Sequence, residues 1–277
     1  MPITDPKLNI VTALAEEARP IVHHFRLKRR HDIHPFAVYE NLQTTLIVAG
    51  IGNLAAATAT GYLAGIARSN QHAAWLNVGI AGAKRGEIGD FVLAHKISDH
   101  HHKRHYYPTL WFEHGCKTAP LITVEEPVVN YNDDVLFDME AYGFCSAAMN
   151  FSTSELVHCC KIISDNYHVS IDNISPQSVV NWVEQNLINI QHVAESLLQG
   201  ASKLNSDIKG REDAELIKSK YHFTTSQQSQ LDLVLQKWFA MSDESPVNNL
   251  DFTTIKNAKD VLRELNAKLN QLPVDYQ

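Results

Sequence analysis

Three acidic residues follow apolar runs that are typical of buried strands, and they carry the clearest chemical signal in the 277-residue chain. They are Glu17, Glu140 and Asp165. Because ligands bind at the carboxyl ends of strands in open α/β sheets, we expect the three carboxylates to meet at one edge. Together they would suit acid/base chemistry. The structural alternative is that each lies at a helix N-terminus, where the helix dipole is worth less than about 2 kcal/mol.

The elements that must position these carboxylates can be predicted from apolar runs and from glycine and proline. Strands are expected at 8–14, 36–42, 44–49, 74–80, 91–97, 121–124, 135–137 and 156–163. Helices are expected at 53–67, 140–149 and 176–198. A further short helix should run through Phe25 with Pro20 in its first turn, where a missing N–H is harmless. Gly200 is expected to end the helix 176–198.

The pattern changes character along the chain, from strand-rich before residue 165 to wholly helical after residue 203. We therefore expect an α/β domain over residues 1–202 and a helical extension over residues 203–277. Within the extension, 226–241 and 252–272 each place apolar residues on one helical face. These faces are expected to pack on the main domain or on a second subunit.

Composition excludes several classes of function. A net charge of −7 argues against binding to nucleic acid or to an anionic membrane. No apolar run approaches the roughly 18 residues of a membrane span, and the first residues lack the features of a signal peptide. The four cysteines form no CxxC pair, which favours buried thiols in a reducing cytoplasm. The histidines between 95 and 105 are mostly adjacent and are interpreted as a polar loop rather than a metal site, so no metal or cofactor is expected.

Two glycine-bearing segments mark further strand ends. Residues 50–55 match GxGxxG/A, but no acidic residue lies between Glu40 and Glu87 to hold a ribose, so we reject a dinucleotide site. The alternatives are a tight turn or amides that approach another small ligand. Residues 77–82 carry Gly79 and Gly82, and beside the carboxylates they favour a ligand cradle. The basic stretch 23–31 is interpreted as surface, with phosphate or partner contact as the alternative.

In this order, the segments resemble the purine nucleoside phosphorylase and nucleosidase superfamily. The resemblance is strongest to the branch that hydrolyses methylthioadenosine and S-adenosylhomocysteine. It spans residues 8–200 and rests on the acidic turn 11–18, Gly50-Ile51-Gly52, 77–82 with Gly89-Asp90, Met139-Glu140-Ala141 and Ser164-Asp165. It implies a three-layer α/β fold with a mixed central sheet. It also implies a homodimer that acts on purine nucleosides.

The same resemblance implies roles for individual residues. Glu17 would activate water, Glu140 would hold the ribose hydroxyls, and Asp165 would protonate the leaving purine. Met139 would pack against the sugar. The remaining substrate-binding candidates are Gly52, Gly79, Ile80, Lys161 and Ser164.

The chain departs from the family pattern in four places. Ile80 replaces a Ser or Thr whose hydroxyl helps to hold phosphate or water, and Lys161 replaces an Arg and so lacks its planar fork. The stretch before Asp138 is short and lacks one family helix, and the extension has no family counterpart. The expected function is hydrolysis of the N-glycosidic bond of a purine or 5′-substituted nucleoside.

Two alternatives stay open. One is a phosphorylase, with phosphate held by Lys161 or by basic residues in 26–30. The other is a nucleoside-binding or partner-binding protein with weak or no catalysis.

Overall fold

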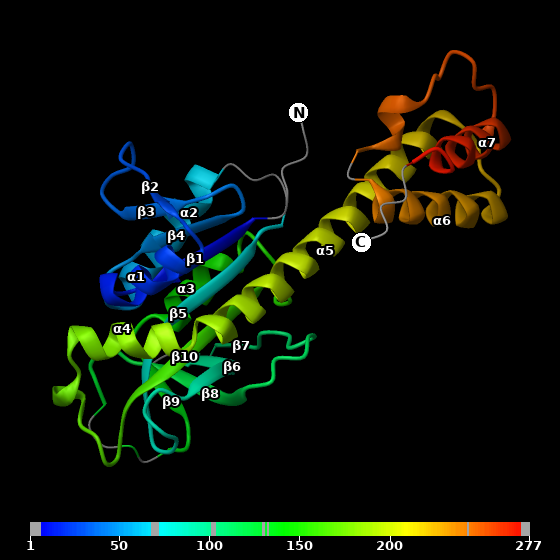
Figure 1. Ribbon diagram of the computed structural model, residues 1–277. Helices are drawn as coiled ribbons and strands as arrows, with labels where there is room; N and C mark the ends of the chain where they lie inside the picture. Colours follow the sequence, from blue (N-terminus) through cyan, green and yellow to red (C-terminus); the bar gives the residue numbers. More distant parts are fainter. Residues whose placement is uncertain are drawn as a thin grey trace. The chain divides into compact units, whose positions relative to one another are not determined.

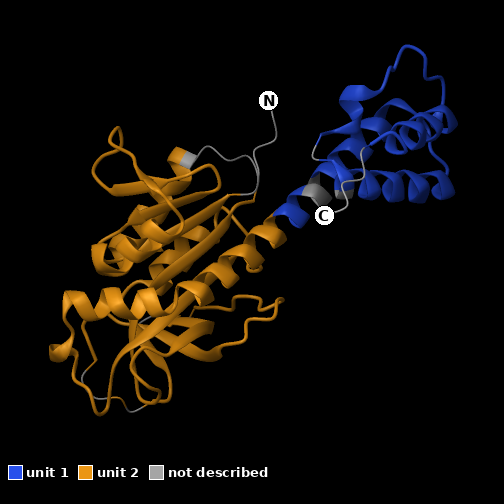
Figure 2. Ribbon diagram, viewed as in Figure 1, with its two compact units in different colours: residues 1–5, 202–277 blue, residues 6–201 orange. Residues whose placement is uncertain are grey.

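The computed structural model describes residues 7–67, 72–100, 104–128, 131, 133–242 and 244–272. The chain divides into two compact units, of which one comprises residues 6–201 and the other contains residues 202–277 (Figure 2). Helix α5, Leu187–Lys220, contributes residues to both. Among the described residues, no helix combines the length and apolarity that a membrane crossing requires.

The first unit is built on a mixed sheet in which the described strands follow the order β2-β3-β4-β1-β5 and then close into a ring. Strand β10 pairs with both β5 and β6, β8 joins β6 to β9, and β9 returns to β5. The strands are β1 Leu8–Thr12, β2 Lys28–Arg29, β3 Ala37–Glu40, β4 Thr44–Val48, β5 Ala74–Ala83, β6 Phe91–Asp99, β7 His105–Tyr106, β8 Lys117–Thr123, β9 Leu136–Asp138 and β10 Val157–Asn166.

Strands β1, β5 and β10 lie side by side and run parallel, so their carboxyl ends meet at one edge. All three are buried along nearly their whole length. Parallel strands covered on both faces have continuous apolar sequences rather than alternating ones. This burial explains why the sequence shows these strands as largely apolar runs without strict alternation.

Helices cover the sheet on two sides (Figure 1). Helices α2, Asn53–Ala67, and α3, Ala141–Ala148, pack together on the face that carries Val11 and Ile47. Helices α1, Ala15–His24, and α4, Pro176–Gln185, pack together on the opposite face. The three-layer α/β fold with a mixed sheet is thus confirmed.

Helix α1 begins earlier than the sequence suggested. It starts at Ala15, so Pro20 lies inside the helix rather than in its first turn. The reason is Glu17, whose carboxylate accepts the backbone N–H groups of Ala13 and Leu14 and so fixes the first turn upstream of the proline.

The predicted helix 176–198 is wrong at both its interior and its end. It is interrupted at Asn186, whose side-chain amide donates to the carbonyls of Gly89 and Trp182 and separates α4 from α5. Helix α5 then continues past Gly200 to Lys220. Gly200 is required for packing, since a Cβ there would collide with the ring of Trp111.

The second unit has a hydrophobic core of its own, formed by the end of α5 with α6, Thr225–Met241, and α7, Ala258–Leu269. Leu231 and Trp238 of α6 and Leu265 of α7 are at most 2% exposed within this core. The described residues of that cluster all lie between 214 and 269. The expectation that these faces pack on the main domain or a second subunit is therefore wrong, because they pack on one another.

Candidate active site

The three predicted carboxylates line one cavity of about 200 Å³. Glu17 follows β1, Glu140 lies between β9 and α3, and Asp165 is near the end of β10. Each side chain is at least nine-tenths buried. The lining is completed by two polar residues, Tyr131 and Asp138, and by small or apolar residues: Ala13, Leu14, Ile51, Ile80, Ala81, Gly82, Val124, Pro127, Val128, Phe137, Met139, Ser164, Ile171 and Ile174.

Backbone amides hold the Glu17 carboxylate in place. Its Oε2 accepts the N–H groups of Ala13 and Leu14, each at 2.9 Å, and its Oε1 accepts the N–H of Ile80 at 3.0 Å. Burial raises the pKa of Glu17, while these amides and the charge of Lys161 oppose the rise. The result is a fixed carboxylate that is more basic than one in water.

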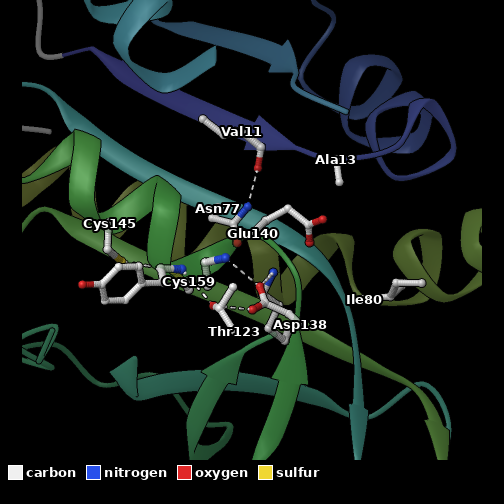
Figure 3. A network of polar contacts seen from close by, with 12 residues as sticks. Val11, Ala13, Asn77, Ile80, Thr123, Asp138, Glu140, Cys145 and Cys159 are labelled. Atoms are coloured by element: carbon white, nitrogen blue, oxygen red, sulfur yellow. Dashed lines mark hydrogen bonds and ion pairs between the residues drawn. The ribbon is translucent and has the colours of Figure 1, made fainter. Parts of the chain in front are cut away.

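Asp138, a lining residue labelled in Figure 3, belongs to a buried ion pair. Lys161 Nζ is 2.7 Å from Asp138 Oδ2, and both side chains are at most 1% exposed. Asp138 also accepts the Thr123 hydroxyl at 2.7 Å and the Ala141 N–H at 2.8 Å. Although burial lowers it, the pKa of Lys161 is raised overall by Asp138 and Glu140. Lys161 therefore stays charged and balances the acidic residues around it.

Glu140 is oriented by the glycine turn before α2. The N–H of Gly52 donates to Glu140 Oε1 at 2.8 Å, and Gly52 adopts a φ of +108°, which favours glycine. The amide of this turn therefore donates to a carboxylate of the protein itself. Burial, followed by the negative charge of Asp138, raises the pKa of Glu140 to about 7.

Asp165 is held by two hydroxyl groups. Ser164 Oγ donates to its Oδ1 at 2.5 Å, and the hydroxyl of Tyr131 donates to its Oδ2. The backbone of Gly82 runs beside this pair: a Cβ built there would lie 2.8 Å from Asp165 Oδ2 and in contact with the Tyr131 hydroxyl. Glycine at position 82 therefore makes room for the acid and for its partner.

The structure brings six of the nine predicted site residues to the cavity. These are Glu17, Ile80, Met139, Glu140, Ser164 and Asp165. Gly52, Gly79 and Lys161 lie outside the lining. Gly79 provides space: a Cβ there would be 3.1 Å from Glu17 Oε1 and 3.4 Å from Lys161 Nζ.

Two polar lining residues were missed as site residues. Asp138 could have been found, because it directly precedes Met139-Glu140 and a lone buried lysine needs a partner. Tyr131 gave no signal, since it stands in a polar stretch without periodicity. The histidines at 101 and 102 lie outside the described residues, and no group of metal-ligating side chains occurs among the residues that are described.

Gly82→Ala is expected to impair the site more than the fold. The new Cβ displaces the ends of two side chains, so we expect at least a tenfold loss of activity and a stability loss of about 1–2 kcal/mol. The measurements are the catalytic rate of the purified protein and its unfolding free energy in urea. Gly61→Ala in helix α2 is the control, because a Cβ there meets nothing within 4 Å and should stabilise by about 0.5–1 kcal/mol. Equal activity of both variants would contradict this prediction.

Glu140 should make the folded protein less stable as the pH rises. Its folded pKa of about 7 lies above its ordinary value of 4.5, so its contribution is complete below pH 4.5 and is lost as the pH passes through 7. The displacement corresponds to at most about 3 kcal/mol. Glu140→Gln should therefore reduce the fall in the unfolding free energy between pH 5 and pH 8. Part of the fall should remain in the variant, because the pKa of Glu17 is also raised.

The exposed Glu184→Gln in α4 serves as the control. A Glu140→Gln curve parallel to that of the wild-type protein would show that Glu140 is ionised in the folded state at pH 5.

Comparison by sequence gives no match, either to a protein-family model or to a curated protein. Comparison of structures gives many. The chain is similar to the 5′-methylthioadenosine/S-adenosylhomocysteine nucleosidase of S. pneumoniae, with a TM-score of 0.55 and 16% identity over 69% of this chain and 98% of the other. It is also similar to the 5′-methylthioadenosine nucleosidase of Arabidopsis thaliana, with a TM-score of 0.57 and 18% identity over 70% and 97%.

A third similar structure is a futalosine hydrolase mutant of Helicobacter pylori, with a TM-score of 0.56 and 12% identity over 70% of this chain and 99% of the other. This chain has the nucleoside phosphorylase-like fold. The resemblance drawn from the sequence motifs is confirmed at the level of the fold. Identities of 12–18% leave the reaction and its residues to the chemistry of the site.

Proposed function

We propose that this protein is a nucleosidase that hydrolyses the N-glycosidic bond of a purine nucleoside or a 5′-substituted nucleoside. The observation that carries the proposal is the convergence of Glu17, Glu140 and Asp165 on one buried cavity. The nucleosidases with the same fold support it. Breaking the bond between C1′ and the base develops positive charge on the sugar and negative charge on the base. The site therefore needs a carboxylate near the sugar and an acid near the base.

Glu17 is proposed as the base that takes a proton from the attacking water. Three backbone N–H groups fix the carboxylate, and its raised pKa makes it a better proton acceptor. Ile80 supports a water nucleophile, because its N–H holds Glu17 while its aliphatic side chain lines the cavity.

Glu140 is proposed to bind the ribose hydroxyls and, when ionised, to stabilise the sugar cation. Glu140 lines the cavity, and its Oε1 is held by the N–H of Gly52. Met139, its neighbour in the lining, would pack against the sugar. Asp165 is proposed as the acid that protonates the departing base, since it lines the same cavity from the adjacent strand β10.

The charge of the cavity disfavours the phosphorylase alternative. Its described lining contains four carboxylate side chains, Glu17, Asp138, Glu140 and Asp165, and no Lys or Arg. Lys161 is engaged by Asp138 and lies outside the lining. Glu17 and Glu140, when ionised, repel phosphate and attract a cationic sugar.

We also propose that the protein is a cytoplasmic homodimer. The resemblance to the superfamily supports the dimer, and the four cysteines without a CxxC pair support the cytoplasm. Ile51, which lines the cavity just before α2, and Leu54, in the first turn of α2, are 60% and 81% exposed and offer apolar surface for a second copy. Light scattering on the purified protein measures the mass of the particle, which should be twice that of the chain.

The test of the function is chromatographic detection of free base. The protein is incubated with methylthioadenosine, S-adenosylhomocysteine, adenosine and inosine, each with and without phosphate. Base released without phosphate is the expected result and names the substrate class. Release only with phosphate would establish the phosphorylase instead. Binding of these nucleosides without release would favour the binding protein.

A further inference from the structure

Both carboxylate oxygens of Asp165, the residue proposed to protonate the leaving base, already accept hydrogen bonds from the protein. Ser164 occupies Oδ1, and Oδ2 accepts the hydroxyl of Tyr131. Asp165 and Tyr131 both line the cavity. A base that approaches Asp165 from the cavity therefore encounters a carboxylate with a hydroxyl donor on each oxygen.

Tyr131 is seated firmly at this end of the cavity. Its side chain is buried, with 7% exposed, and its ring packs on Phe137 with 5.9 Å between ring centroids. Its hydroxyl lies over the backbone of Gly82, where any larger residue would collide with it. The phenol is thus accommodated by a glycine on β5 and an aromatic ring on β9.

The hydroxyl of Tyr131 is a donor rather than a phenolate. Burial, together with the hydrogen bond to Asp165, raises the pKa of Tyr131 well above its ordinary value. A donor that is aimed at Oδ2 satisfies the ionised form of Asp165. The catalytic acid must instead present its own proton to the base, so this hydrogen bond and productive base binding oppose each other.

We propose that Tyr131 is an internal competitor for the base site, which sets the affinity for the base by holding the Asp165 oxygen that the base must reach. The inference rests on the proposed role of Asp165 as the group that meets the base. The cavity size agrees with it: with Tyr131 in place the volume is about 200 Å³, below the roughly 300 Å³ at which ligand pockets usually begin. Base binding then requires the hydroxyl to release Asp165.

Tyr131→Phe separates the competing hydroxyl from the ring. The variant keeps the contact with Phe137 and removes only the hydrogen bond to Asp165. Binding of adenine and hypoxanthine is measured by calorimetry on the full chain, and release of base from nucleosides is measured in parallel. Tyr221→Phe is the matched control, because it also removes one tyrosine hydrogen bond, to the Ile255 carbonyl, from a residue that does not line the cavity.

The expected result is that Tyr131→Phe lowers the Kd for at least one base about tenfold, as removal of a hydrogen bond to a charged group allows, while Tyr221→Phe leaves it unchanged. Equal or weaker binding by Tyr131→Phe would overturn the inference and make Tyr131 a support for Asp165. Absence of binding by every form would overturn it as well. Tighter binding without cleavage of any nucleoside would uphold the role of Tyr131 and refute the proposed nucleosidase.

Discussion

Asp165→Asn is expected to abolish base release while the protein stays folded. Asparagine has nearly the same volume but has no proton to give to the departing base at neutral pH. General acid catalysis contributes about 10²–10⁴-fold, so the rate should fall by that factor. Stability should fall by only about 1–2 kcal/mol, because one of the two hydroxyl donors, Ser164 or Tyr131, would face the amide NH₂. The measurements are the rate of base release and the unfolding free energy.

The matched control is Asp172→Asn. Asp172 is exposed and, like Asp165, accepts the hydroxyl of a nearby serine, Ser170 at 3.1 Å. It does not line the cavity. Asp172→Asn should therefore keep wild-type turnover. Wild-type turnover in Asp165→Asn would instead assign the acid to another residue.

Lys161→Met is expected to cause the largest loss of stability of any single substitution considered. It leaves Asp138 buried without its cation, and breaking a buried ion pair from one side costs about 3–5 kcal/mol. The effect should extend to the site, because the charge of Lys161 lowers the pKa values of both Glu17 and Glu140. The unfolding free energy in urea provides the measurement.

Two further variants test the cause of this loss. Lys161→Met combined with Asp138→Asn should recover part of it, since the uncompensated negative charge is then removed. Lys117→Met breaks the Lys117–Asp90 pair, in which the lysine is 68% exposed, and should leave stability nearly unchanged. A double variant no more stable than Lys161→Met would show that hydrogen bonding by Asp138, rather than its charge, causes the loss.

The sequence located the strands and the carboxylates because both depend on local or strongly patterned features. Strands β1, β5 and β10 are buried along nearly their whole length, so their sequences are largely apolar, and residues of the site lie near their carboxyl ends. The glycine turn before α2 could be located as a turn, but its partner Glu140 is 88 residues away. Only the fold reveals that the turn's amide serves this carboxylate.

The errors arose where tertiary contacts override local preference. Gly200 looked like a helix end, yet α5 continues through it, and the ring of Trp111 lies where a side chain at position 200 would have to be. The apolar faces of the helices in the extension showed that each must pack against another surface. Helical periodicity alone does not identify that surface, which proved to be the other helices of the extension. Tyr131 reaches Asp165 across 34 residues of chain, and nothing in its local sequence indicates that contact.

The most direct test of the proposed reaction is mass spectrometry of the sugar released in H₂¹⁸O, with saturating phosphate present. A nucleosidase should release a free sugar that carries one ¹⁸O atom at C1′, because Glu17 would activate water in a cavity whose described lining carries four carboxylates and no Lys or Arg. A sugar 1-phosphate without ¹⁸O would show that phosphate is the nucleophile and would refute the proposed hydrolysis.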